Sequence, residues 1–79
     1  MKYPIRILNE LLAPVQGATV NLKGYTGTTD SKGYALVIAP KFNPETLIVS
    51  VEHPSYITAA MLYSEVKSNG GVATLEAKR

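Results

Sequence analysis

Apolar and polar residues alternate along several short stretches of the chain. A period of two is typical of a β-strand with one buried and one solvent-facing side. The pattern is clearest at residues 47–53, where Leu47, Val49 and Val51 are predicted to face the core while the residues between them face water. The same reasoning predicts seven strands, at residues 3–9, 18–22, 25–29, 34–38, 47–53, 56–63 and 72–78.

Single residues refine the expectations for two of these strands. In the strand at 3–9, Tyr3, Ile5 and Ile7 share one face. Pro4 has no backbone N–H to donate, which predicts either that this strand lies at a sheet edge or that Pro4 lies at a strand start. In the apolar run at 34–38, the residues predicted to point inward are Tyr34, Leu36 and Ile38.

Turn and loop signals separate the strands. Asp-Ser-Lys-Gly at 30–33 is typical of a tight turn, because Asp can accept a hydrogen bond from a nearby backbone N–H and Gly tolerates a positive φ. Two prolines exclude a helix or a central strand at 39–46. No segment shows a helical period, and 64–71 is predicted to be a polar connection with an Asn-Gly turn. Connections in a sandwich alternate between its two ends. The turns at 10–16, 30–33 and 53–55 are therefore expected at one end, and the two longer loops, at 39–46 and 64–71, are expected at the other.

Seven short strands with turn signals every eight to twelve residues predict an all-β antiparallel sandwich. We expect a single domain over residues 1–79. An oligonucleotide-binding barrel is the alternative, but it needs longer and strongly bent strands, and five of these are harder to find here. The chain has 79 residues and no Cys, so packing and backbone pairing must stabilise it without disulfides.

The order and spacing of several turn and strand residues resemble those of a known family. These residues are Asn9, Pro14-Val15, Gly17-Ala18-Thr19-Val20, Thr29-Asp30, Gly33-Tyr34, Val49, Val51, Pro54 and Tyr56. Over a little more than half of its length, the chain resembles the carboxypeptidase regulatory-like domain. The resemblance implies a transthyretin-like, immunoglobulin-like sandwich of seven antiparallel strands. It also implies a non-catalytic module that aids folding, attachment or partner contact.

The chain departs from that family in two loops. Leu11 and Leu12 occupy a turn where the family usually has polar residues and glycine, and the loop at 39–46 replaces a tight Pro-Gly turn. The two leucines either fold back to cap the core or form an exposed anchor that is buried on docking. The residues predicted to bind a protein partner are Leu11, Leu12, Lys41 and Phe42.

The setting predicted for the chain is a larger assembly. Modules of the resembled family usually sit inside longer chains, whereas this sequence runs from Met1 to Arg79. We therefore expect a structural accessory or decoration component, for example of a phage particle, with a capsid or tail protein as partner and with self-association as a further expectation. Pro4, Arg6 and Asn9 interrupt any apolar leader, so we expect no signal peptide, no membrane segment, synthesis in the cytoplasm and a place in the virion.

Residues with catalytic or metal-binding chemistry are few and scattered. His53 is the one histidine, and no Gly-x-Ser-x-Gly turn or orienting carboxylate accompanies it. We expect a surface residue at a strand end and no enzyme. Asp30 and Glu52 are the acidic residues nearest to turns, but calcium needs six to eight oxygen ligands and no acidic loop supplies them. We therefore expect Asp30 to form a turn, and we expect no metal or cofactor.

The five tyrosines support a second class of function. Tyr3 and Tyr34 are in phase with inward positions, which leaves Tyr25, Tyr56 and Tyr63 to stack on bases or sugars. The alternative is therefore a carbohydrate- or nucleic-acid-binding β-module that uses exposed tyrosines and lysines. Eight basic and six acidic side chains give a formal net charge of +2 without a basic run, which is weak support for nucleic acid.

Overall fold

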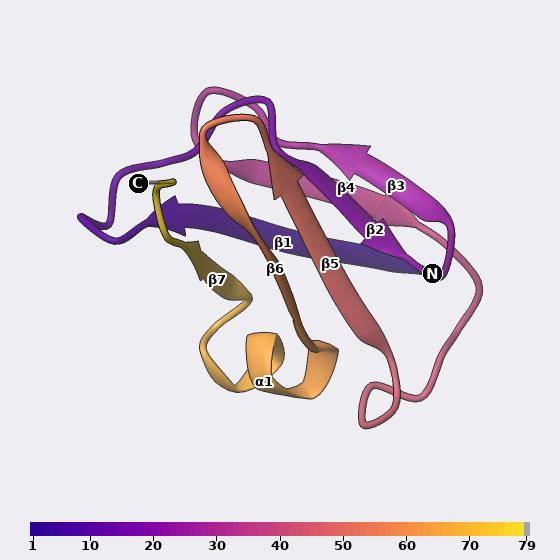
Figure 1. Ribbon diagram of the computed structural model, residues 1–79. Helices are drawn as coiled ribbons and strands as arrows, with labels where there is room; N and C mark the ends of the chain where they lie inside the picture. Colours follow the sequence, from indigo (N-terminus) through magenta and orange to yellow (C-terminus); the bar gives the residue numbers. More distant parts are fainter. Residues whose placement is uncertain (79) are drawn as a thin grey trace.

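The chain forms two facing β-sheets, with one short helix between the last two strands (Figure 1). The computed structural model describes residues 1–78. The elements are β1 (Lys2–Asn9), β2 (Thr19–Leu22), β3 (Tyr25–Thr28), β4 (Tyr34–Ile38), β5 (Ile48–His53), β6 (Tyr56–Leu62), α1 (Tyr63–Ser68) and β7 (Val72–Leu75). The predicted all-β class with seven strands is confirmed at this level.

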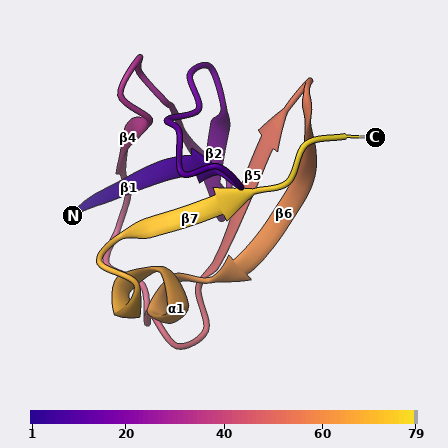
Figure 2. The ribbon, with the colours of Figure 1, turned by 90° about the vertical axis from the view of Figure 1, so that its left-hand side faces the viewer.

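One sheet has the strand order β4-β1-β7 and the other has the order β3-β2-β5-β6. Neighbouring strands are antiparallel except β1 and β7, which run parallel with Arg6 opposite Val72 and Asn9 opposite Leu75. The prediction of a wholly antiparallel sandwich is therefore wrong in this pair. The reason is that β6 ends in the other sheet, and α1 and the following turn return the chain so that β7 runs in the direction of β1 (Figure 2).

The core lies between the sheets and follows the predicted alternation in most strands. Leu47, Val49 and Val51 are fully buried, as predicted, and so are the inward residues of β1 and β2. The largest fully buried side chains are Tyr3, Ile5, Ile7, Leu22, Leu47, Leu75, Val20, Val37, Val49, Val51 and Val66.

The prediction for β4 is wrong, because this strand presents its smaller residues to the core. Ala35 and Val37 are buried. β3 and β4 approach closely where the two sheets meet, so that a Cβ on Gly27 would lie 2.9 Å from the carbonyl oxygen of Leu36 and 3.2 Å from a methyl group of Val37. Residue 27 therefore has no room for a side chain where β3 approaches β4. The outward and exposed residues of β4 are Tyr34, Leu36 and Ile38.

Pro4 lies near the start of a strand that is not an edge strand. β1 is the middle strand of its sheet, so the interpretation that Pro4 marks an edge strand is wrong. The N–H of Arg6 donates to Gly71 at 2.8 Å, and the backbone nitrogen of Pro4, two residues earlier, therefore points to the same side. Within residues 1–78, strand β7 pairs with β1 only from Arg6 onward. Proline is thus tolerated because β7 needs no donor at this position.

The helix α1 was not predicted, since residues 64–71 were expected to be a polar connection. Tyr63 and Val66, one helical turn apart, are both buried. The N–H of Asn69 donates to Glu65 and Val66, and Gly70 has a φ of 73°. The predicted Asn-Gly turn is therefore present, and it ends a six-residue helix.

The predicted division of the loops between two ends is confirmed (Figure 1). At one end, Pro14 approaches Gly33 and the carbonyl of Gln16 is 3.0 Å from the His53 ring, which brings the turns at 10–16, 30–33 and 53–55 together. At the other end, the N–H of Ser64 donates to Pro44 at 3.0 Å, which joins the two longer loops.

Candidate partner-binding surfaces

The turn that carries Leu11 and Leu12 is held in one conformation by Asn9. The Asn9 side-chain oxygen accepts hydrogen bonds from the N–H groups of Leu11, at 2.9 Å, and Ala13, at 3.0 Å. The Asn9 backbone donates to Ala13 and accepts from Leu12. These bonds occupy the polar groups of the turn internally, so its shape does not depend on contacts of the two leucine side chains.

Both leucines project into water. Leu11 is 84% exposed and Leu12 is 70% exposed, so the interpretation that they cap the core is wrong. Leu12 also has a φ of 62°, in the left-handed region where a residue other than glycine costs about 1 kcal/mol or more. We call Glu10, Leu11 and Leu12 the tip. Exposure of apolar side chains to water is unfavourable, yet the backbone of the tip holds both leucines outward.

Lys41 and Phe42 lie in the loop at the opposite end of the molecule from the tip (Figure 1). Phe42 is half-buried, its ring centroid is 6.4 Å from that of Tyr3, and its N–H donates to the Tyr3 hydroxyl at 2.8 Å. The ammonium of Lys23 lies 4.9 Å from the Phe42 ring centroid. Phe42 therefore packs against the core, Lys41 is exposed, and the four predicted residues do not form one surface.

The outer face of the β4-β1-β7 sheet is a surface that was not predicted. Its exposed apolar residues on β4 lie beside β1, with Leu36 opposite Pro4 and Tyr34 opposite Arg6. The Arg6 guanidinium lies 4.9 Å from the Tyr34 ring centroid. None of these three strands contains Asp or Glu. The error in the inward face of β4 concealed this surface, because it placed Tyr34 and Leu36 in the core.

The outer face of the other sheet is more polar. Along β2 and β5, the outward positions include Asn21, Ser50 and Glu52, with Ile48 as the exposed apolar residue. The two outer faces therefore differ in chemistry. Apolar side chains with cations among them gather on the three-stranded sheet, which is where a partner surface of opposite charge would be favoured.

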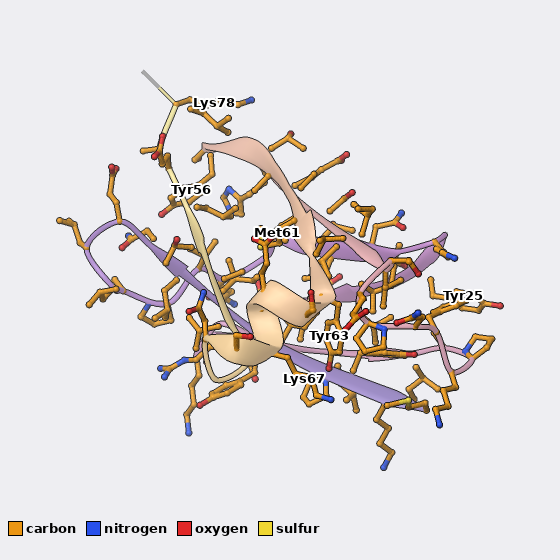
Figure 3. All side chains as sticks on the ribbon, turned by 90° about the horizontal axis from the view of Figure 1, so that it is seen from below. Tyr25, Tyr56, Met61, Tyr63, Lys67 and Lys78 are labelled. Carbon is orange, nitrogen blue, oxygen red and sulfur yellow. The ribbon has the colours of Figure 1, made fainter. Side chains whose placement is uncertain are left out.

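A hollow of about 590 Å³ opens beside the first half of β1. Its cationic lining comes from Lys2 and Arg6 on β1 and from Lys67 on α1. Lys67 lies beside β1 in the view from below (Figure 3). Ile5 and Tyr63, both buried, contribute to its inner wall. Burial raises the pKa of the Tyr63 phenol above its usual value of 10.0, and the nearby phenol of Tyr3 adds to this.

His53 has a structural position. Its Nδ1 accepts a hydrogen bond from the N–H of Ser55 at 3.0 Å, so the ring proton lies on Nε2 and is donated to the carbonyl of Gln16 at 3.0 Å. Both ring nitrogens are therefore engaged in joining two turns. This role was not predicted, because Gln16 comes close only through the pairing of β2 with β5.

Asp30 forms its turn as predicted. One carboxylate oxygen accepts from the N–H groups of Lys32 and Tyr34, and the Gly33 N–H donates to the Asp30 carbonyl. Among residues 1–78, no group of three or more His, Cys, Asp or Glu side chains could hold a metal ion.

The tyrosines do not form a common platform. Tyr34, predicted to be inward, is half exposed, whereas Tyr63, predicted to be available for stacking, is buried. Tyr3 is buried as predicted. Tyr25 and Tyr56 lie at opposite sides of the molecule (Figure 3). Binding of a carbohydrate or a nucleic acid stays a prediction, without the shared aromatic surface on which it depended.

Comparison with known proteins places this chain in no family: no family model matches it, and no curated protein matches it. Within the described residues, no helix has the length and apolar character needed to cross a membrane.

Proposed function

We propose that this chain is a non-catalytic structural module that binds another protein within a larger assembly, and that the Leu11–Leu12 pair is its anchor. The observation that carries the proposal is the exposure of both leucines on a turn fixed by four hydrogen bonds of Asn9. A preformed turn loses little conformational freedom on docking, so more of the energy of burying its side chains contributes to affinity.

The energy available from this anchor is substantial for so few residues. Full burial of a leucine side chain contributes roughly 1.5–3 kcal/mol, so burial of Leu11 and Leu12 together would contribute about 3–6 kcal/mol before the costs of association. The unbound protein already holds Leu12 in its left-handed conformation, so docking does not have to supply the conformational free energy for it. The sum exceeds the roughly 2 kcal/mol that defines an interface hot spot, although Trp, Tyr and Arg fill that role more often than Leu does.

We also propose kinship with carboxypeptidase regulatory-like domains. Two facing sheets with seven strands are compatible with their transthyretin-like, immunoglobulin-like sandwich, from which the parallel β1–β7 pair departs. Modules of that kind aid attachment or partner contact, which agrees with an exposed anchor and with a His53 ring that is occupied in structural hydrogen bonds. The particle of a phage remains the setting that we propose for the assembly.

The test compares partner binding by the wild type with that of the double variant Leu11→Ser, Leu12→Ser. Each tagged protein is produced in the cells that naturally carry this gene, and bound proteins are quantified by mass spectrometry. The matched control is Ile48→Ser with Ile57→Ser, which also replaces two exposed apolar residues by serine. We expect the tip variant alone to lose its partner at an unchanged melting temperature. Equal partner recovery from all three proteins would refute the proposed anchor.

A further inference from the structure

We propose that the tip of one copy of this protein enters the hollow of a second copy, so that the chain assembles head to tail. The inference rests on the proposed function, because it names the protein that the tip binds. The tip is Glu10, Leu11 and Leu12, and the hollow is the space lined by Lys2, Arg6 and Lys67.

The hollow exists because β7 is shorter than β1. β7 pairs with β1 only from Arg6 onward, and the chain before Val72 turns away through Gly70 and Gly71 to α1. The space beside the first residues of β1 is therefore bounded by α1 and the glycine turn, with Ile5 and Tyr63 behind it. A volume of about 590 Å³ lies within the range of pockets that take compact ligands.

Pro4 determines what kind of group suits this space. An added β-strand would need backbone donors along this edge of β1, but Pro4 faces the hollow and has no N–H. Side chains that project from a turn need no such donors. The hollow is thus better suited to a projecting apolar tip than to a pairing strand.

The charges of the two surfaces are complementary. Three cationic side chains line the hollow, and none of its described lining residues carries a carboxylate. The tip places the carboxylate of Glu10 next to Leu11. Two hollows that faced each other across a symmetric dimer would instead bring six cations together, which disfavours that arrangement.

The tip and the hollow lie toward opposite ends of β1. The tip follows Asn9 at the end of the strand, whereas the hollow lies beside Lys2 to Arg6. A strand rises about 3.3 Å per residue, so a tip cannot fold back into the hollow of its own chain. Contact between two different surfaces repeats in one direction, and it produces either a ring or an open filament.

Sedimentation analysis over a range of concentrations tests the inference. The wild type is expected to increase in weight-average mass with concentration, and less so in high salt. The tip variant Leu11→Ser, Leu12→Ser and the hollow variant Lys2→Glu, Lys67→Glu are each expected to associate at least tenfold more weakly. The matched control, Lys23→Glu with Lys78→Glu, changes the net charge by the same amount at exposed residues elsewhere and should assemble as the wild type does.

A mixture of the two defective variants makes the test specific. The tip variant retains an intact hollow and the hollow variant retains an intact tip, so the mixture should form a one-to-one dimer that cannot grow. Adding Glu10→Lys to the hollow variant should restore its self-association by reversing both charges.

The outcomes separate this inference from the proposed function. A monomeric wild type whose cellular partner is lost on serine exchange at the tip would show that the tip binds a different protein, which overturns the inference and leaves the function standing. A hollow variant that assembles as the wild type does would overturn the inference as well. If the variant Leu11→Ser, Leu12→Ser changes neither self-association nor partner binding, both the inference and the proposed function are overturned.

Discussion

Gly33 tests how closely the Asp30–Gly33 turn is packed against β1. Its φ is 83°, and a Cβ built on it would lie 2.5 Å from the carbonyl oxygen of Ile7 and 3.2 Å from the Cβ of Pro14. The Gly33 carbonyl also accepts a hydrogen bond from the Ile7 N–H at 2.7 Å. The substitution Gly33→Ala must therefore strain the backbone and also push the turn away from β1.

Gly24 separates these two effects. Its φ is 92°, but a Cβ there would meet no atom within 4 Å. Gly24→Ala should therefore destabilise by backbone strain alone, about 1–2 kcal/mol. Gly33→Ala carries the same strain and adds the cost of overpacking, typically about 1–3 kcal/mol, so its expected total is about 2–5 kcal/mol.

Urea unfolding of both variants and the wild type, followed by circular dichroism, measures the difference. Midpoints can be compared directly if the three slopes agree. We expect Gly33→Ala to have the lower midpoint by a margin that corresponds to at least about 1 kcal/mol. Equal midpoints would refute the close approach of the turn to Ile7, and with it the explanation of how this end of the sandwich is closed.

Three further predictions concern the core, the pH dependence and the tip. Val49→Ala should destabilise the fold by about 2–3 kcal/mol, since Val49 is fully buried, whereas Ile48→Ala at an exposed position should cost less than about 1 kcal/mol. The reverse order in urea unfolding would show that the faces of β5 are inverted. Burial, and then a neighbouring phenol, raises the pKa of Tyr63, so the folded state keeps its proton to higher pH than the unfolded state does. The stability that protonated Tyr63 contributes is thus fully present below about pH 10 and is lost as the pH rises further. The melting temperature of Tyr63→Phe should therefore fall less steeply between about pH 9 and 11 than that of the wild type. Asn9→Ala should remove three side-chain hydrogen bonds, two accepted from the turn and one donated to the Tyr56 hydroxyl, cost about 1–2 kcal/mol, and speed amide exchange in the 9–13 turn. Unchanged exchange would show that the turn does not depend on this side chain.

The pattern of residues predicted strands better than it predicted their environment. In β5, polar and apolar residues alternate clearly enough to identify the buried side. In β4, both sides are largely apolar, so the larger residues were assigned to the core. The available volume reverses this choice: β3 approaches β4 closely at Gly27, and it is Ala35 and Val37 that lie buried between the sheets. That volume depends on contact between two sheets, which a single strand's pattern does not contain.

The helix and the parallel strand pair have related causes. Six residues are too few to display a helical period, and the polar residues of α1 outnumber Tyr63 and Val66. The direction of β7 relative to β1 depends on how the chain returns after this helix. Local patterns predict where strands begin and end, but the order of strands within a sheet is determined by contacts that are distant in sequence.

The candidate site was predicted in part. The unusual placement of Leu11 and Leu12 in a turn identified the residues that the structure exposes, although the sequence left their burial open. Lys41 and Phe42 were grouped with them, yet Phe42 packs on Tyr3 at the other end. The hollow had no signal in the sequence, because it arises from a difference in length between β1 and β7.

The parallel pair of β1 and β7 also has a consequence for synthesis of the chain. β1 can pair with β4 once Ile38 has emerged from the ribosome, but the other edge of β1 stays unpaired until residues 72–75 have emerged as well. At roughly 5–20 residues per second, the interval lasts on the order of seconds, and during it β1 offers an unpaired edge to other nascent chains. Pro4 removes one donor from that edge, which makes intermolecular strand pairing less favourable. Replacing Pro4 should therefore increase aggregation of newly made protein more than it changes the stability of the folded state.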